Sequence, residues 1–178
     1  MALWRSLPAP NRRWIVLNAL LVSALINLVV NAALAWLGVR GADVPLMGVP
    51  LLETSTIVDT VGTFFILPLL TCLLCTSAVW YERRNRELPS LDWTRDSHPW
   101  LAAPPWSRLG RGLRLGTLVT LLLAPPAVIL LVATDFGGIS TGQFVLYKAI
   151  LGVALGALVT PPIALWAMSD PLGDEISP

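Results

Sequence analysis

Charged residues are scarce in this chain, and long stretches of it contain none. Only 13% of the 178 residues are charged, whereas 55% are hydrophobic, and the mean hydropathy is +0.70. Because soluble domains carry about 25% charged residues, this composition excludes an ordinary soluble domain. The net charge of +1 provides no basic stripe for a phosphate backbone, so we expect no nucleic-acid partner.

Residues that build metal and catalytic sites are equally few. His98 is the only histidine, and it follows Asp96 and Ser97 directly in the sequence. A catalytic triad requires side chains that converge from separate parts of a chain, which such neighbours do not. The sequence also lacks a metal-ligand cluster, a phosphate-binding loop and a nucleotide-binding fingerprint. We therefore expect a non-enzymatic protein without a cofactor or a metal.

What the chain does contain is four apolar runs without a charged residue. Each has about 20 residues or more, the length of helix that crosses ~30 Å of hydrocarbon. The uncharged runs are Trp14–Leu37, Thr60–Tyr81, Leu115–Thr134 and Ala149–Met168. The sequence therefore predicts an all-α integral membrane protein with one domain, residues 1–178. Its four transmembrane helices, about 14–37, 57–81, 113–134 and 144–168, are expected to form two antiparallel hairpins.

The segments between the runs differ in character. A loop of about 20 residues joins the first two runs, and a short glycine-rich turn at 135–138 joins the last two. The connector at about 82–112 combines arginines with Trp93, Trp100 and Trp106. Tryptophan and arginine favour the lipid headgroup region, so we expect this connector to lie along the membrane interface.

Arginine positions predict the orientation in the membrane. The first loop carries Arg40 alone and the loop at 135–142 has no basic residue, whereas the N-terminal segment and the connector are rich in arginine. The positive-inside rule therefore places the N-terminus, the connector and the C-terminus in the cytoplasm. The acidic tail does not oppose this, because acidic residues count little in the rule. The arginines are Arg5, Arg12, Arg13, Arg83, Arg84, Arg86, Arg95, Arg108, Arg111 and Arg114, and the acidic residues are Asp170, Asp174 and Glu175.

The first run has a second interpretation as a signal peptide. It follows a basic flank, and Ala33-Leu34-Ala35 matches a small-x-small cleavage site. The run is longer than a usual signal sequence, and its removal would leave an odd number of spans. We therefore interpret it as a transmembrane helix. The preference for arginine over lysine, with Lys148 the only lysine, favours a bacterial source and hence a bacterial cytoplasmic membrane.

Polar residues recur at helical spacing within or beside the runs. Asn27 and Asn31 lie one turn apart, and Asp59 and Thr63 share a face of the second helix in the same way. Asp59 and Lys148 stand just before two runs that cross the membrane in the same direction. The sequence therefore places these five residues at similar depth, as a polar cluster in the outer third of the bundle.

Three interpretations of Asp59 and Lys148 remain open on sequence alone. The two residues could mark the outer interface, with the lysine extending to the headgroups. They could form a structural ion pair that fixes helix register. They could also line an outward-facing polar pocket with a transport function.

Glycine and proline give further signals in the spans. Gly112 and Gly116, and Gly152 and Gly156, form two GxxxG pairs that allow another helix to approach closely. We expect intramolecular packing to use one pair and to leave the other for a partner. Prolines inside the runs predict kinks, since each removes a backbone donor. They are Pro68, Pro125, Pro126, Pro161 and Pro162.

Cys72 and Cys75 form the only C-x-x-C pair. In this pair and in the number of spans, the chain resembles quinone-linked thiol oxidoreductases of membranes. Those enzymes need the pair near the external face and usually a second pair. Here the pair lies about two turns from Arg83, in the inner half of its span, and no second pair exists. Small apolar thiols packed within a helix are the better interpretation.

These observations order the functional hypotheses. We expect a small non-enzymatic subunit or assembly factor of a membrane complex, which contacts the lipid bilayer and either another membrane protein or a second copy. The alternative is a small transporter or channel component with a polar pathway near Asp59 and Lys148. A membrane thiol oxidoreductase is the third hypothesis.

Overall fold

The computed structural model of the chain is all-helical over the residues it describes, which are 2–39, 41, 43–47, 55–94, 96–104, 106–134 and 138–171. An isolated bridge between Val44 and Ile139 ties two loops together, and the described residues form no strand. Several residues used in the sequence predictions lie outside the described ranges. They are Arg40, Arg95, Asp174, Glu175 and residues 135–137 of the glycine-rich turn.

Four helices are long and apolar enough to cross a membrane, which supports a multi-pass membrane protein. The first is continuous over Ala9–Val39 and consists of α2 (Ala9–Trp14), a π-helical segment η1 (Ile15–Val22) and α3 (Ser23–Val39), preceded by the short α1 (Ala2–Ser6). The other three are α4 (Thr56–Arg84), α5 (Arg108–Ala133) and α6 (Thr141–Met168). Each includes the corresponding predicted span to within one residue and extends it.

Serine side chains begin three of these helices. Ser55 Oγ accepts from the backbone of Val58 at 3.4 Å, and Ser107 Oγ accepts from Gly110 at 3.1 Å. Ser140 and Gln143 form a reciprocal capping box at the start of α6. These caps satisfy backbone donors that have no partner in the first turn, so local sequence determines where these three helices begin.

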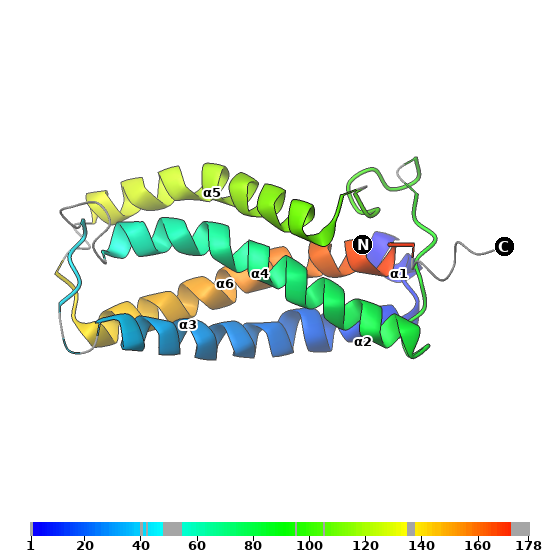
Figure 1. The fold of residues 1–178 in the computed structure, drawn as a ribbon, viewed down its shortest axis with the longest axis horizontal. Coiled ribbons are helices and arrows are strands. Elements are labelled where there is room, and N and C mark those ends of the chain that lie inside the picture. The colour runs from blue at the N-terminus through cyan, green and yellow to red at the C-terminus, as the bar shows by residue number, and fades with distance from the viewer. Residues whose placement is uncertain are drawn as a thin grey trace.

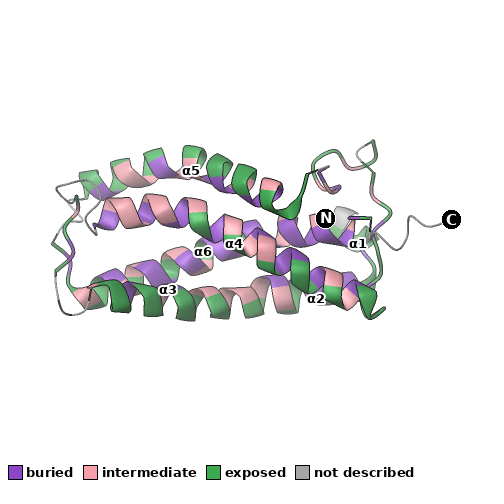
Figure 2. Cartoon of the chain, viewed as in Figure 1, coloured by how far each residue is buried: buried purple, intermediate pink, exposed green. Residues whose placement is uncertain are grey.

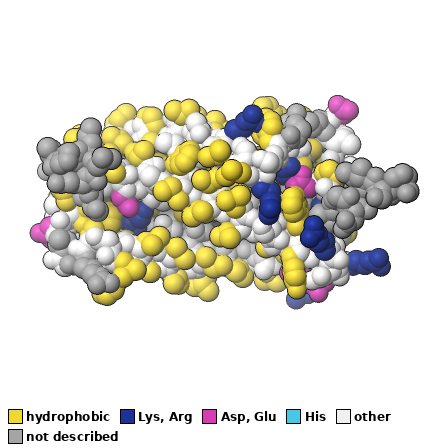
Figure 3. Space-filling model, in the orientation of Figure 1, with side chains coloured by type: hydrophobic (Ala, Val, Ile, Leu, Met, Phe, Trp, Pro, Cys, Tyr) yellow, Lys and Arg dark blue, Asp and Glu magenta, His cyan; other side chains and the backbone are white. Residues whose placement is uncertain are grey.

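The helices pack in the spatial order α3, α6, α4, α5 (Figure 1). Extensive contacts join α3 with α6, α6 with α4, and α4 with α5. The first two spans make few or no contacts with each other, and so do the last two. The predicted pairing of consecutive spans into hairpins is therefore not confirmed. The short α1 and the C-terminal end of α6 lie at the same end of the bundle, and Figure 3 shows most Lys and Arg side chains gathered there.

Burial follows this order. In the most apolar 18 residues of each span, 44% are buried in α6 and only 17% in the first span. Figure 2 shows α3 largely exposed along its length. The core lies between α4 and α6, where Phe64, Cys72 and Ile163 are buried. In a bilayer the exposed apolar faces of α3 and α5 are the surfaces that meet lipid or another protein.

Both glycine pairs are used inside the chain. A Cβ added to Gly116 would stand 2.6 Å from the carbonyl oxygen of Phe65, and one added to Gly112 would stand 2.8 Å from a methyl group of Leu69. These glycines therefore let α5 approach α4 closely. Gly152 and Gly156 of α6 receive side chains of α3 in the same way. The expectation that one pair is left free for a partner is thus not supported.

The helices run continuously through their prolines. Pro68 lies inside α4, Pro125 and Pro126 inside α5, and Pro161 and Pro162 inside α6. Figure 1 shows α5 bowed rather than straight. The prolines therefore bend the helices without interrupting them, and they do not divide a span into two half-helices.

Candidate functional site

A groove of about 640 Å³ lies between the first span and α4, with α6 as its floor. Its lining extends from Asp59 to Glu82 on α4 and from Trp14 to Leu34 on the first span. At 1.5 Å per helical residue, the α4 wall is roughly 35 Å long, close to the ~30 Å of a hydrocarbon core. The groove therefore runs through the depth of both leaflets.

An ion pair occupies the part of this groove near the start of α4. Lys148 Nζ lies 2.6 Å from Asp59 Oδ2, and the lysine also donates a hydrogen bond to Thr63 Oγ1. The Lys148 side chain is 5% exposed, whereas that of Asp59 is 30% exposed and lines the groove. The two charges therefore meet within the bundle, and the interpretation as separate markers of the interface is not supported.

Helical spacing on α4 and α6 assembles this pair. Thr63 follows Asp59 by one turn, and its hydroxyl donates to the Asp59 carbonyl at 2.7 Å, which directs the hydroxyl oxygen toward the lysine. Beside the pair, Thr60 Oγ1 and Tyr147 Oη are 2.7 Å apart. Polar contacts between α4 and α6 thus continue around the ion pair, as buried charges require.

The asparagines of α3 sit on the glycines of α6. A Cβ on Gly152 would stand 2.7 Å from Asn31 Cγ, and a Cβ on Gly156 would stand 3.1 Å from Asn27 Cγ. Any larger residue at either glycine would collide with an amide. Two features that the sequence analysis described separately, the asparagine pair and the glycine pair, are therefore the two sides of one helix contact.

Hydrogen bonds continue this contact toward the middle of the membrane. Asn31 Nδ2 donates to the Asn27 carbonyl at 2.8 Å, and Asn27 Nδ2 donates to the Ser23 carbonyl at 2.9 Å. Ser23 Oγ lies 2.9 Å from Thr160 Oγ1 on α6. A polar group thus occurs at every turn of α3 along the groove.

The π-helical segment η1 extends the same face toward the N-terminal end of the first span. Asn18 lies five residues before Ser23, about one turn of a π-helix, and both residues line the groove. In an ordinary α-helix this spacing would turn Asn18 away from Ser23. π-Helical turns occur frequently at functional sites, and nothing in the apolar pattern of residues 15–22 signalled this one.

Several polar atoms of this face have no partner among the described residues. The side-chain amide of Asn18 makes no hydrogen bond there, and the Oδ1 atoms of Asn27 and Asn31 receive none. The amide nitrogens of Asn27 and Asn31 bond only within their own helix. Because hydrocarbon offers no hydrogen bonds, such groups require water or another protein at this depth.

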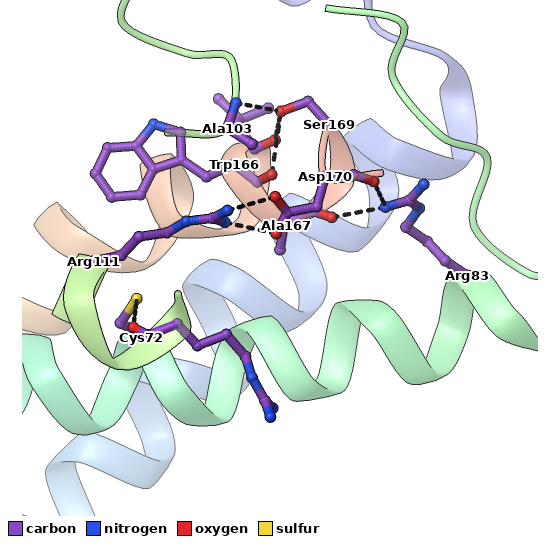
Figure 4. Close-up of polar contacts among 10 residues, drawn as sticks. Cys72, Arg83, Ala103, Arg111, Trp166, Ala167, Ser169 and Asp170 are labelled. Carbon is purple, nitrogen blue, oxygen red and sulfur yellow. Dashed lines mark hydrogen bonds and ion pairs between the residues drawn. The ribbon is translucent and has the colours of Figure 1, made fainter. Parts of the chain in front are cut away.

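A second buried cluster closes the opposite end of the bundle (Figure 4). Arg111 donates two hydrogen bonds of 2.6 Å to the carboxylate of Asp170, and both side chains are buried. Arg83 donates to the backbone carbonyls of Ala167 and Asp170 at 3.1 and 2.6 Å. The last residues of α6 are therefore fixed to α4 and α5 by arginine.

This second cluster was not predicted from the sequence. Arg83 and Arg111 were interpreted as topology signals and Asp170 as part of an acidic tail. One sequence signal did exist, because Arg111 directly precedes Gly112 of the first GxxxG pair. Gly112 contacts α4, so the turn of α5 that carries Arg111 is packed against another helix. The connector also covers this end, because Ala103 donates to Ser169 Oγ at 2.9 Å and Trp166 Nε1 donates to the Trp100 carbonyl at 3.1 Å.

The described residues contain no group of His, Cys, Asp or Glu suited to a metal ion. Cys72 and Cys75 are free and buried. The Cys72 thiol points toward the Arg108 carbonyl, with sulfur and oxygen 3.6 Å apart. The cysteines thus belong to the packed core between α4 and its neighbours.

The ion pair of Asp59 and Lys148 predicts an asymmetric response to substitution. Asp59→Asn leaves the buried Lys148 ammonium without its counter-ion, so we expect a loss of about 3–5 kcal/mol in the free energy of unfolding. Lys148→Met leaves a carboxylate that is already partly exposed, so the loss should be smaller. The double variant should recover most of the stability. Unfolding titrations in mild detergent test this, and single variants as stable as the wild type would contradict the pair.

The cluster of Arg83, Arg111 and Asp170 makes a separate prediction. Asp170→Asn should lower the free energy of unfolding by about 3–5 kcal/mol, because the guanidinium of Arg111 stays buried without its carboxylate. Asp92→Asn is the matched control, since Asp92 is an exposed acid of the connector and its loss should change stability by about 0.5 kcal/mol or less. Thermal unfolding of both variants in the same detergent is the measurement. Equal effects would show that the cluster does not hold α6 in place.

Comparison with known proteins adds no assignment to this geometry. No family model, no curated protein and no solved structure matches the chain. A function for it therefore rests on the groove, its ion pair and its uncovered polar groups.

Proposed function

We propose that the protein is a small non-enzymatic component of a membrane transport or channel assembly, in which the groove forms one wall of a polar pathway. The observation that carries this proposal is the row of polar groups at each turn of the first span, which faces the groove through most of the membrane depth. Leaving such groups against lipid costs several kcal/mol each, so a water-filled or protein-covered space is the environment that suits them.

The shape of the groove supports a wall rather than a complete pore. Its floor is α6, its sides are the first span and α4, and the fourth side is open between exposed apolar residues such as Val30 and Leu70. An open side within the bilayer cannot hold a column of water on its own, because lipid tails would enter it. The role of a subunit, completed by a further transmembrane element, follows from this shape.

The ion pair gives the pathway its chemistry. Asp59 is partly exposed to the groove while its partner Lys148 is buried, so the carboxylate is the charged group that a passing ion or polar solute would meet first. The lysine offsets most of that charge. A paired carboxylate of this kind suits transient contact with a small cation or a hydrogen-bonding solute better than permanent binding.

For orientation, we propose that both termini and the connector face the cytoplasm of a bacterial cell. The support is the concentration of arginine at the end of the bundle where both termini lie, with Arg83, Arg108 and Arg111 among the described examples. The groove then has its ion pair toward the external side of the membrane and Glu82 toward the cytoplasmic side.

Thiol accessibility tests whether water reaches the groove. In a background with Cys72→Ala and Cys75→Ala, Asn18→Cys places a thiol inside the groove. Leu21→Cys is the control from the same π-helical segment, because Leu21 is 61% exposed but does not line the groove. Only a thiolate reacts with a methanethiosulfonate, and thiolates form only where water is present, so Asn18→Cys should react at least about tenfold faster in membrane vesicles.

The opposite result is equally clear. If both cysteines react at the same slow rate in correctly folded protein, the groove is as dry as the lipid-facing surface. The polar groups would then serve packing alone, and the proposed pathway would be wrong.

A further inference from the structure

We propose that the open side of the groove is covered by the first span of a second copy of this chain, about a two-fold axis along the membrane normal. This inference rests on the proposed function, since it names the element that completes the pathway. It follows from the length of the groove, the chemistry of its polar residues, its charge balance and the exposed face beside it.

The length of the groove favours a helix as its occupant. A lipid molecule reaches from one interface to about the middle of the hydrocarbon. The lining, in contrast, extends from Trp14 to Leu34 on one wall and from Asp59 to Glu82 on the other. At 1.5 Å per residue these walls are roughly 30 and 35 Å long, which is the depth of both leaflets. A transmembrane helix matches that length, and an acyl chain also offers no hydrogen bonds to the amides.

One uncovered polar residue, Asn18, is self-complementary. Its amide makes no hydrogen bond among the described residues and carries both donors and an acceptor, so the same residue from a second copy can satisfy it. A two-fold axis along the membrane normal brings residues of equal depth opposite each other. Asn18 of one copy would therefore face Asn18 of the other, and a hydrogen bond between such amides stabilises helix association in membranes.

The charge balance permits such a symmetric contact. A lone aspartate or lysine in the groove would face its own copy across the axis and repel it. Here Asp59 and Lys148 neutralise each other at 2.6 Å within each chain. No other charged residue lies on the lining until Glu82 at the far end.

The rim of the groove supplies a matching apolar surface. Ile26, Val30 and Leu34 follow each other by one turn on α3, line the groove and are 54%, 46% and 62% exposed. The first span is also the least buried of the four, so it is the span with most surface left for another helix. Two such ridges, packed side by side about the axis, would enclose the polar faces of both copies between them.

Native mass spectrometry and cross-linking of the purified protein test this arrangement. From mild detergent or a lipid nanodisc, we expect a species of twice 19.2 kDa for the wild type. In the background with Cys72→Ala and Cys75→Ala, Val30→Cys should form a disulfide between copies on mild oxidation. Leu121→Cys is the control, because Leu121 is 68% exposed on α5 at the other side of the bundle and should form at most a tenth as much cross-linked dimer.

Each other outcome overturns the inference. A 19.2 kDa species alone, a monomer carrying one retained phospholipid, or equal cross-linking at positions 30 and 121 would exclude the two-fold contact. Cross-linking of the Val30→Cys variant to a different membrane protein, in place of a second copy, would also exclude it. If no dimer forms but Asn18→Cys still reacts with a water-soluble reagent, this inference is wrong and the proposed function is retained. If a dimer forms but Asn18→Cys does not react, the proposed pathway is wrong and the dimer is retained.

Discussion

The contact between the asparagines of α3 and the glycines of α6 determines most of what is distinctive in this structure. Gly152 and Gly156 have no side chain, and the amides of Asn31 and Asn27 occupy the space that any other residue would fill. This contact holds the first span on the fourth and away from the second. The separation of α3 from α4 is what leaves a groove between them, and the asparagines that make the contact are also the residues that line it.

Two buried ion pairs stabilise the rest of the bundle at opposite depths. Toward one end, Lys148 and Asp59 join α6 to α4, and toward the other, Asp170 and Arg111 join α6 to α5. Each pair is accompanied by a further hydrogen bond: Lys148 also donates to the Thr63 hydroxyl, and Arg83 donates to the backbone carbonyl of Asp170. Because desolvated charges are costly, both pairs depend on this additional hydrogen bonding. The central position of α6 follows from its participation in both.

Much of the fold was predictable because it depends on local sequence. The length and hydropathy of an apolar run are properties of consecutive residues, so four spans and most of their limits could be given without a structure. The similar depth of Asp59 and Lys148 was predictable for the same reason, since depth follows from position along a run. Serine before a helix likewise signals its first turn, as at Ser140.

The remainder depends on which surfaces fit together, and that is not a local property. No local pattern decides whether α3 packs on α4 or on α6, because the asparagine and glycine faces lie more than a hundred residues apart in the sequence. Asp170 follows the last span directly and is indistinguishable from a solvated tail until Arg111 is seen beside it. The π-helical segment was hidden because Asn18 is its only polar residue, and a single polar position defines no periodicity that would distinguish its register.

Cysteine pairs within a single chain test the central claim most directly, which is that α3 is held by α6 and stands apart from α4. A disulfide requires Cβ atoms about 3.5–4.5 Å apart, so it reports which helix is the neighbour. Asn27→Cys with Gly156→Cys should form an intramolecular bridge in the membrane, because the smaller thiol at position 27 makes room for the side chain added at 156. Val30→Cys with Ile66→Cys, from opposite walls of the groove, should not. A bridge between positions 30 and 66, with none between 27 and 156, would show that the groove is closed and would contradict the account.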